Sequence, residues 1–237
     1  MPSMLEIQEL TVNLVNSLQS PAAVINLDSL VGMGVVPQAW ELVQAPVYSP
    51  QGVQLRFQSG IAITAQPGRI LITEIMGTKA IADSQVAPLA RKLVQSLPNL
   101  DYEAIGLNPL GHAKLGDTAA AVRHYLNHTL LAAGPWQQIG NEPVQSRVSL
   151  TYTFDEHQLN ITINEAGLRT DSEELSPVAL FSGNFSTVFS GSAAERVAQL
   201  TQSLDRWQQD VERFQSIVNG TFLAAVTTQP ALLPVFA

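Results

Sequence analysis

Two histidines four residues apart are the clearest chemical signal in the sequence. His124 and His128 fall on one predicted helix, where residues at i and i+4 share a face. That spacing suits zinc or another divalent ion, and His112 or Asp117 is the candidate third ligand. A zinc protease needs glutamate after the first histidine, but Tyr125 stands there. The alternative is that both histidines lie on a surface or interface and bind no metal.

Motifs of covalent and phosphate chemistry are absent from the sequence. There is no Gly-x-Ser-x-Gly elbow, no Walker loop and no Gly-x-Gly-x-x-Gly pattern. The absence of cysteine excludes thiol nucleophiles, disulfides and Cys-ligated metal. The acidic run at Asp171, Glu173 and Glu174 lacks the spacing of a calcium loop. We therefore expect no catalytic residues and no cofactor, and the balance leans away from an enzyme.

The charge and hydrophobic content of the chain indicate which kinds of partner it can bind. Of the 237 residues, 46% are hydrophobic and only 14% are charged, against about 25% in an average globular protein. The net charge is −8 and the 12 basic residues are scattered, so a nucleic-acid-binding surface is not expected. No signal peptide and no apolar run of about 20 residues occurs. The expectation is a soluble, acidic, cytoplasmic protein without a membrane span.

The elements that must position any site begin with a set of strands. Alternating apolar and polar residues predict a meander after an initial strand, with strands at 6–15, 53–57, 61–65 and 69–75. Residues 22–27 are predicted as a further short strand, and 43–50 as an extended loop with two prolines.

The second half of the chain adds more strands. A short strand is expected at 102–107, followed by a loop at 111–116 that carries His112. Residues 147–154 and 159–163 form the clearest predicted hairpin. A second hairpin is predicted from strands at 178–181 and 185–189, with its turn at Ser182-Gly183-Asn184.

Apolar stripes at helical spacing predict three main helices. They run from Asp83 or Ser84 to about Leu97, from Asp117 or Thr118 to about Ala132, and from Ser192 to about Val218, the longest. This order of elements favours an α+β fold with antiparallel sheet built from a meander and hairpins. The chain is predicted to be a single domain over 1–237, or two closely packed halves, about 1–135 and 136–237.

Aromatic and apolar residues outside the periodic elements are the candidate interaction residues. Trp40 and Trp136 lie in connections that contain proline or glycine, where tryptophan either covers the edge of a core or anchors a partner. The segment 222–237 is apolar and nearly uncharged, so it must dock on its own core or on another chain. The candidates in that segment are Phe222, Leu232, Leu233 and Phe236.

Two short runs resemble a known protein family. They are Tyr102-Glu103-Ala104-Ile105-Gly106 and the segment from Leu204-Asp205-Arg206-Trp207 to Phe214. Together with the element order from Val53 onward, they resemble an uncharacterised, sporadically distributed family of bacterial and archaeal proteins. The motifs are short, so no family is assigned on them and no function carries over.

Two functional hypotheses follow from the sequence. The first is a non-catalytic interaction protein: an adaptor, assembly factor or subunit of a larger intracellular complex, with a protein partner or further copies of itself. The absence of catalytic motifs, the low charge and the apolar C-terminal segment favour it. The alternative is a small-molecule- or metal-binding enzyme that uses His112, His124 and His128.

Overall fold

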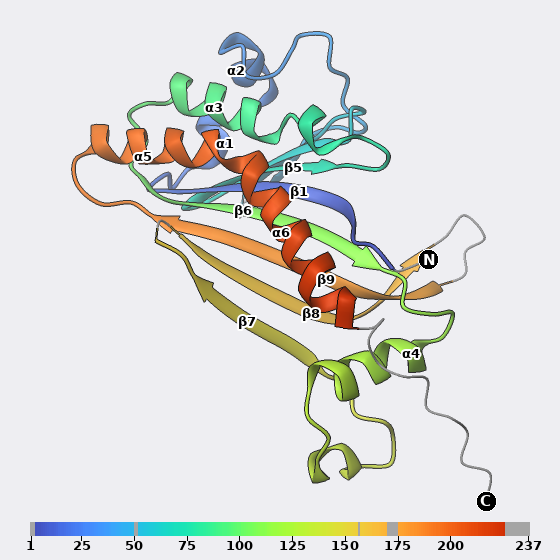
Figure 1. The fold of residues 1–237 in the computed structure, drawn as a ribbon. Coiled ribbons are helices and arrows are strands. Elements are labelled where there is room, and N and C mark those ends of the chain that lie inside the picture. The colour runs from blue at the N-terminus through green and yellow to red at the C-terminus, as the bar shows by residue number, and fades with distance from the viewer. Residues whose placement is uncertain (1–2, 50–51, 156, 170–174, 226–237) are drawn as a thin grey trace, which may run out of the picture.

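The computed structural model describes residues 3–49, 52–155, 157–169 and 175–225. These residues form an α+β fold around one antiparallel sheet of nine strands (Figure 1), in the order β2-β3-β4-β5-β1-β6-β9-β8-β7. The α+β class and the antiparallel sheet are therefore confirmed. The strands are β1 (Glu6–Asn16), β2 (Val47–Ser49), β3 (Gly52–Arg56), β4 (Ile61–Gln66), β5 (Arg69–Ile75), β6 (Tyr102–Ala113), β7 (Arg147–Thr153), β8 (Gln158–Arg169) and β9 (Leu175–Val188).

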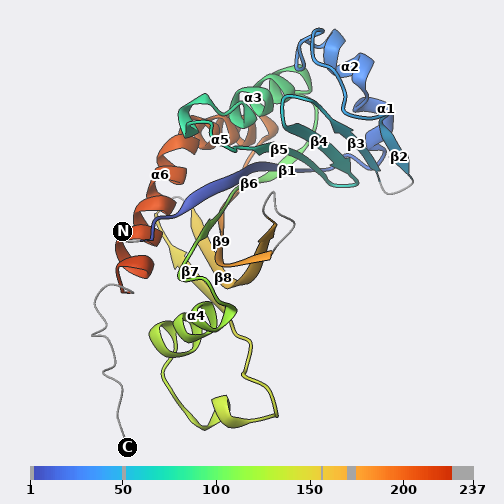
Figure 2. The ribbon, with the colours of Figure 1, turned by 90° about the vertical axis from the view of Figure 1, so that its right-hand side faces the viewer.

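Three helices, α3, α5 and α6, form a layer against one face of this sheet. Figure 2 shows α3, α5 and α6 along the outer side of the curved sheet. None of the described helices is long and apolar enough to cross a membrane. The α-helices are α1 (Pro21–Val24), α2 (Leu27–Gly32), α3 (Val86–Ser96), α4 (Ala119–His124), α5 (Ala193–Asp205) and α6 (Trp207–Ile217). Shorter or wider helical turns are Ile81–Asp83, Tyr125–Leu130, Pro135–Gln138 and Val218–Leu223.

The core lies between the sheet and the helices because successive residues of a strand point to opposite faces. On β1, Leu10, Val12 and Leu14 face the helices and are fully buried or nearly so. Leu200 and Phe214 approach the same layer from α5 and α6 and are fully buried. Burying one such side chain contributes about 1.5–3 kcal/mol, so this layer is the main source of stability.

One predicted strand is wrong. Residues 22–27 belong to α1 and the start of α2 rather than to the sheet. Pro21 stands in the first turn of α1, where proline is tolerated. The Asn26 side chain caps α2 by accepting a hydrogen bond from the Ser29 amide at 2.9 Å. Pro21 and Asn26 thus favour the start of a helix, and this preference overrides the strand predicted from the apolar residues at 22–27.

The strand predicted at 102–107 is longer than expected. β6 continues through Asn108 and Pro109 to Ala113, and pairs with β1 from Tyr102 to His112. The register shifts where Ile7 and Glu9 of β1 face Gly111 and Leu110 of β6. Such a β-bulge places one extra residue in β1 and allows the two strands to pair on both sides of it. The predicted loop at 111–116 is therefore partly strand, and His112 lies in the sheet.

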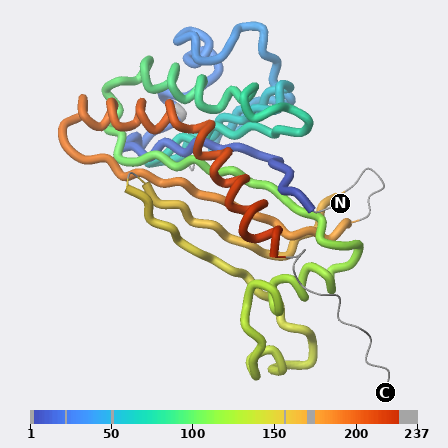
Figure 3. The backbone as a smooth tube through the Cα atoms, in the orientation of Figure 1, coloured from blue at the N-terminus to red at the C-terminus, as the bar shows by residue number. Residues whose placement is uncertain are grey.

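The second predicted hairpin is also wrong. β9 is one strand of 14 residues, and Figure 3 shows it running without a turn. Gly183 serves close packing instead, because a Cβ atom there would lie 2.9 Å from the Phe214 ring and from Pro109 Cγ. A glycine inside a strand often marks such an approach by another element.

The predicted long C-terminal helix is divided in two. α5 ends at Asp205 and α6 begins at Trp207, and Figure 1 shows a bend between the two helices. The predicted end near Val218 is also too early, because helical turns continue to Leu223. The Asn219 side chain accepts a hydrogen bond from the Leu5 amide at 2.8 Å, and Phe222 is buried. Both contacts stabilise the helical conformation of residues 218–223.

A buried carboxylate joins β5 to the start of α3. Glu74 accepts hydrogen bonds from Ser84 Oγ at 2.8 Å and the Gln85 amide at 2.7 Å. Its other oxygen lies 2.8 Å from Lys79 Nζ. The carboxylate thus satisfies an amide at the beginning of α3. α3 begins at Val86, with Gln85 at its N-cap position, rather than directly after Asp83 or Ser84.

Replacing Glu74 with glutamine should destabilise the fold by about 2 kcal/mol, since it removes the ion pair with Lys79 and weakens two charge-assisted hydrogen bonds. Chemical denaturation would measure this difference. The exposed Glu103→Gln on β6 is the control and should change the unfolding free energy by less than about 0.5 kcal/mol. Equal effects of the two substitutions would contradict this role of Glu74.

Candidate functional site

The paired histidines lie on the helical segment that starts with α4. The Thr118 side chain caps this helix by accepting a hydrogen bond from the Ala121 amide at 3.3 Å. The rings of His124 and His128 stack, with their centroids 4.8 Å apart and 30° between their planes. Their spacing thus places both imidazoles on one face of the helix.

The other candidate ligands do not join this pair. His112 lies on β6, with Nε2 3.8 Å from Glu6 Oε2, and it is 7% exposed. Asp117 pairs with Lys114, Nζ to Oδ1, at 3.0 Å. Within the described part of the chain, no three His, Asp or Glu side chains gather into a group that could hold a metal ion. Of the three predicted histidines, the described residues bring together only His124 and His128.

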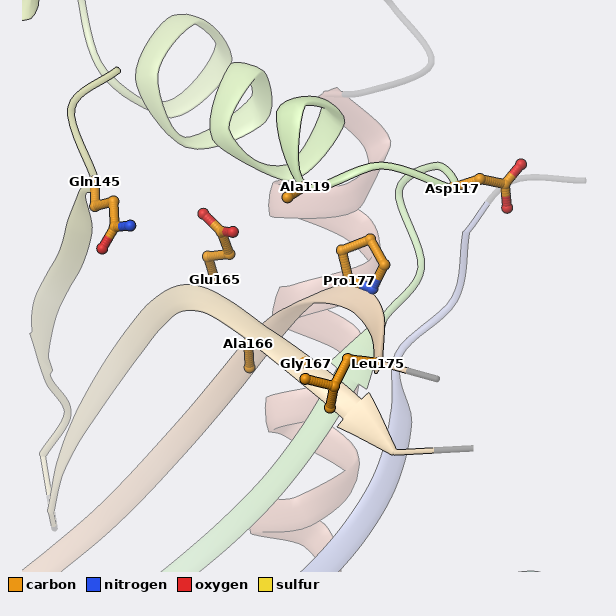
Figure 4. Close-up of a pocket in the computed structure, with 8 residues that line it drawn as sticks. All are labelled: Asp117, Ala119, Gln145, Glu165, Ala166, Gly167, Leu175 and Pro177. Atoms are coloured by element: carbon orange, nitrogen blue, oxygen red, sulfur yellow. The ribbon is translucent and has the colours of Figure 1, made fainter. Parts of the chain in front are cut away.

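A cavity of about 530 Å³ opens between the start of α4, the end of β8 and the start of β9. Figure 4 shows Glu165 reaching from β8 toward α4 along its wall. Both oxygens of Glu165 accept hydrogen bonds from Arg123, from Nε at 2.8 Å and from Nη2 at 3.1 Å. These contacts raise the pKa of Arg123, so its guanidinium stays charged at neutral pH. The cavity is lined by Asp117, Ala119, Gln145, Glu165, Ala166, Gly167, Leu175 and Pro177.

A smaller cavity of about 250 Å³ lies beside the histidine pair, and Arg123 is one of its lining residues. Asn127 also lines it and organises the chain that follows. Its Nδ2 donates to the Val144 carbonyl at 2.9 Å, and its Oδ1 accepts from Ser146 Oγ at 2.5 Å. Gln137 Nε2 donates to the Asn127 carbonyl at 2.6 Å. The two cavities thus lie beside the Arg123–Glu165 ion pair. The chain between Gln137 and Ser146 is anchored near them by its hydrogen bonds to Asn127.

The candidate interaction residues fall in different environments. Trp40 is half-buried and packs edge-on against Phe57, with ring centroids 5.4 Å apart, so it covers the edge of the core. Trp136 is 37% exposed on the turn Pro135–Gln138. Phe222 is buried in its own core, 6.4 Å from the ring of Phe181. The remaining candidates, Leu232, Leu233 and Phe236, lie outside the described residues.

A buried histidine–aspartate pair escaped the sequence analysis. His157 follows the β7–β8 turn and packs between Phe154 and Phe185, each 5.4 Å away between ring centroids. Its Nε2 lies 3.7 Å from Oδ1 of Asp210 on α6, and neither ring nitrogen has a hydrogen-bond partner among the described residues. One signal was present: Asp210 is three residues after Trp207, so it falls on the buried stripe of the helix.

Burial dominates the ionisation of Asp210. Loss of water around the carboxyl group raises the pKa of Asp210, and attraction to His157, Arg206 and Arg213 only partly offsets this. A carboxyl group whose pKa is raised by folding favours the folded state most when protonated. Its contribution to stability is therefore present at acid pH and is lost as pH rises through the folded-state pKa.

The Asp210→Asn substitution should remove this pH dependence. Because asparagine does not ionise, the unfolding free energy of the variant minus that of the wild type should grow as pH rises from 4 to 7. Denaturation at several pH values would measure it. A difference that stays constant, or that falls with pH, would show that burial does not control this carboxyl group.

The face of the sheet opposite the helices carries small polar side chains; we call it the open face. None of the described α-helices lies over it (Figure 2). Polar residues on six neighbouring strands form one row across this face. Each lies directly opposite the next, or is hydrogen-bonded to it, on the adjacent strand. In order from β7 to β5, that row is Thr151, Asn160, Asn184, Asn108, Thr11 and Thr73.

The side chains of this row bond to one another. Asn160 Nδ2 donates to Thr151 Oγ1 at 3.0 Å, and Asn184 donates to Asn108. The hydroxyl oxygens of Thr11 and Thr73 lie 2.8 Å apart. Such contacts hold the amides and hydroxyls in fixed positions on the sheet.

A hollow of about 500 Å³ lies at the meander end of the open face. Thr73, Thr64 and Gln54 line it together with Glu9 and Arg56. At its rim, Val43 is 62% exposed and Ile75 is 54% exposed. The open face therefore combines a polar, uncharged centre with exposed apolar groups at its margin.

Comparisons with known proteins assign no family. No model of a known protein family matches the chain. The search of curated proteins finds no similar sequence. The functional conclusion therefore depends on the geometry of these sites.

Proposed function

We propose that this chain is a non-catalytic interaction protein, an adaptor, assembly factor or subunit of a larger intracellular complex, and that a protein partner docks on the open face. The observation that supports this most is the broad, polar and largely uncharged surface on the uncovered side of the sheet. Thr162, Ser182 and Asn184 lie there, half-buried by their neighbours.

The chemistry of the open face suits a protein partner. Removing a charge from water costs far more than removing an amide or hydroxyl that keeps its hydrogen bond. The residues of the polar row already bond to each other, so a partner can cover them at low cost. Exposed apolar groups at the margin, including Val43, Ile75 and Val188, supply the hydrophobic contacts that stabilise an interface.

Placing a charge on the open face should release the partner. Thr162→Arg adds a long cation to the middle of the surface, and we expect at least a tenfold loss of affinity, since an unpaired buried charge costs more than 1.4 kcal/mol. Native mass spectrometry of protein purified gently from its own source would show whether other polypeptides accompany the 25.5 kDa chain and whether the variant loses them.

The matched control places the same side chain on the helix layer. Gln202 is exposed on α5, so Gln202→Arg should retain every partner. Partners retained by Thr162→Arg would remove the open face from the interface. A chain that carries only a small bound mass would favour the second candidate function.

The second candidate is a small-molecule- or metal-binding role at α4. The specific observation is the cavity of about 530 Å³ beside the forked Arg123–Glu165 pair, because ligand sites typically enclose about 300–1,000 Å³. His124 and His128 could add a two-ligand metal site beside the smaller cavity. Two protein ligands leave most of the coordination to water, so such binding should be weak.

Metal analysis distinguishes a metal site at His124 and His128 from a small-molecule site in the larger cavity. Protein purified without chelator should hold less than one zinc, copper or nickel ion per chain, since a third protein ligand is missing from the described residues. His124→Ala should then leave the metal content unchanged. Stoichiometric metal that His124→Ala abolishes would contradict this expectation and establish the histidine pair as a metal site.

A further inference from the structure

The two edges of the sheet differ in how open they are to further pairing. At one edge β2 has only three residues. At the other, β7 has seven residues and pairs with β8 along its whole length without a register shift. Within the described chain no strand pairs with the outer side of β7, and Figure 1 shows it at the margin of the molecule. β7 is therefore the edge that another strand could extend.

The hydrogen bond that closes the β7–β8 turn identifies which backbone groups face outward. The Phe154 amide donates to the His157 carbonyl at 2.9 Å, so this pair is of the hydrogen-bonded type. Because such pairs alternate along antiparallel strands, the residues that bond to β8 are Phe154, Tyr152, Leu150 and Val148. The residues whose N–H and C=O groups point outward are Thr153, Thr151, Ser149 and Arg147.

β7 lacks the features that normally keep an edge strand unpaired. Proteins protect such edges with lysine, proline, bulges or very short strands. β7 has the sequence RVSLTYT, with one charge at its first residue and no proline. Leu150 lies on the helix side, opposite Ile161, and is 37% exposed. Among the described residues no strand bonds to the outer backbone groups of β7, and its Leu150 is incompletely covered.

We infer that β7 pairs with β7 of a second copy of this chain, antiparallel, about a two-fold axis at Leu150. The nine-stranded sheet would then continue from one copy into the other. This inference concerns the sheet edge and does not depend on the partner proposed for the open face.

The strand is complementary to itself in this register. Arg147 faces Thr153 of the second copy and Ser149 faces Thr151, so all four outward-pointing residues find backbone partners. Leu150 meets Leu150 of the second copy as a non-hydrogen-bonded pair, the type in which side chains are closest. Val148 and Tyr152 would pack beside it, and Arg147 would face no like charge.

In other registers fewer of the outward backbone groups of β7 find hydrogen-bond partners. Centring the axis on Ser149 or Thr151 leaves an outward residue at the end of the strand without a backbone partner. It also places Leu150 opposite Val148 or Tyr152 rather than at the axis. A two-fold contact uses the same surface on both copies, which is why a self-complementary strand favours a second copy over an unrelated extended peptide.

Sedimentation of the full chain over a range of concentrations tests the pairing. The wild type should have twice the 25.5 kDa mass of one chain. Thr151→Pro removes an outward N–H from each copy but no bond to β8, so the dissociation constant should rise at least about tenfold. Thr151→Val keeps the N–H and loses the same hydroxyl, so it should remain dimeric.

A second variant covers the case in which Thr151→Pro does not fold. Leu150→Lys leaves the backbone unchanged and sets two like charges together at the axis, so it should also yield single chains. A wild type that sediments as one chain would overturn the inference. So would a dimer that Leu150→Lys leaves intact.

Single cysteines test the register, because the chain has none of its own. Leu150→Cys should form a disulfide-linked dimer on mild oxidation, since Cα atoms of a non-hydrogen-bonded pair lie roughly 4.5 Å apart. Ser149→Cys is the control: its two copies would be roughly 7–8 Å apart, too far for a disulfide. Cross-linking of Ser149→Cys but not Leu150→Cys would contradict the axis at Leu150.

Discussion

The burial of one face of the sheet under a single helix layer is the constraint on which the rest of this structure depends. Strict alternation along the strands sends leucine, isoleucine and valine to the helix side, as with Leu10, Val12 and Leu14 of β1. Only one layer of helices is available, so the opposite face must be compatible with water. Its threonine, asparagine and serine side chains meet that requirement and leave a surface that a partner can cover.

The same constraint explains where polar groups enter the core. Glu74 is tolerated because Lys79, Ser84 and the Gln85 amide all bond to its carboxylate at the beginning of α3. Asp210 and His157 are less well satisfied, since they lie 3.7 Å apart and burial raises the pKa of the acid. The first group stabilises the helix layer, whereas the second places an acid whose pKa is raised by burial at the contact between α6 and the β7–β8 turn.

Two of the candidate sites lie where the helix layer stops. α4 extends past the sheet, and the cavity between it and β8 is spanned by the Arg123–Glu165 ion pair. At the margin β7 has no strand beyond it within the described chain. A layer that covers the centre of a nine-stranded sheet leaves its ends and one edge accessible, and the α4 cavity and the β7 pairing proposed above lie there, whereas the proposed protein partner uses the open face.

Local patterns in the sequence determined much of the fold. Alternation located β1, the meander and the β7–β8 hairpin, and helical periodicity located α3 and the residues that α5 and α6 bury. These signals are local, because burial of one face imposes a period of two or 3.6 residues on the chain. That the chain forms a single domain remains a prediction.

Tertiary contacts decided the rest. Ser182-Gly183-Asn184 has the composition of a turn, yet it stays in β9 because Gly183 packs against Phe214 of α6. His112 lies in β6 because that strand pairs with β1 almost to its end, which keeps it apart from the stacked histidines. His157 and Asp210 are 53 positions apart in the sequence, and only the packing of α6 over the sheet brings them together. Contacts between distant segments leave no periodic signal, so the sequence alone could not reveal them.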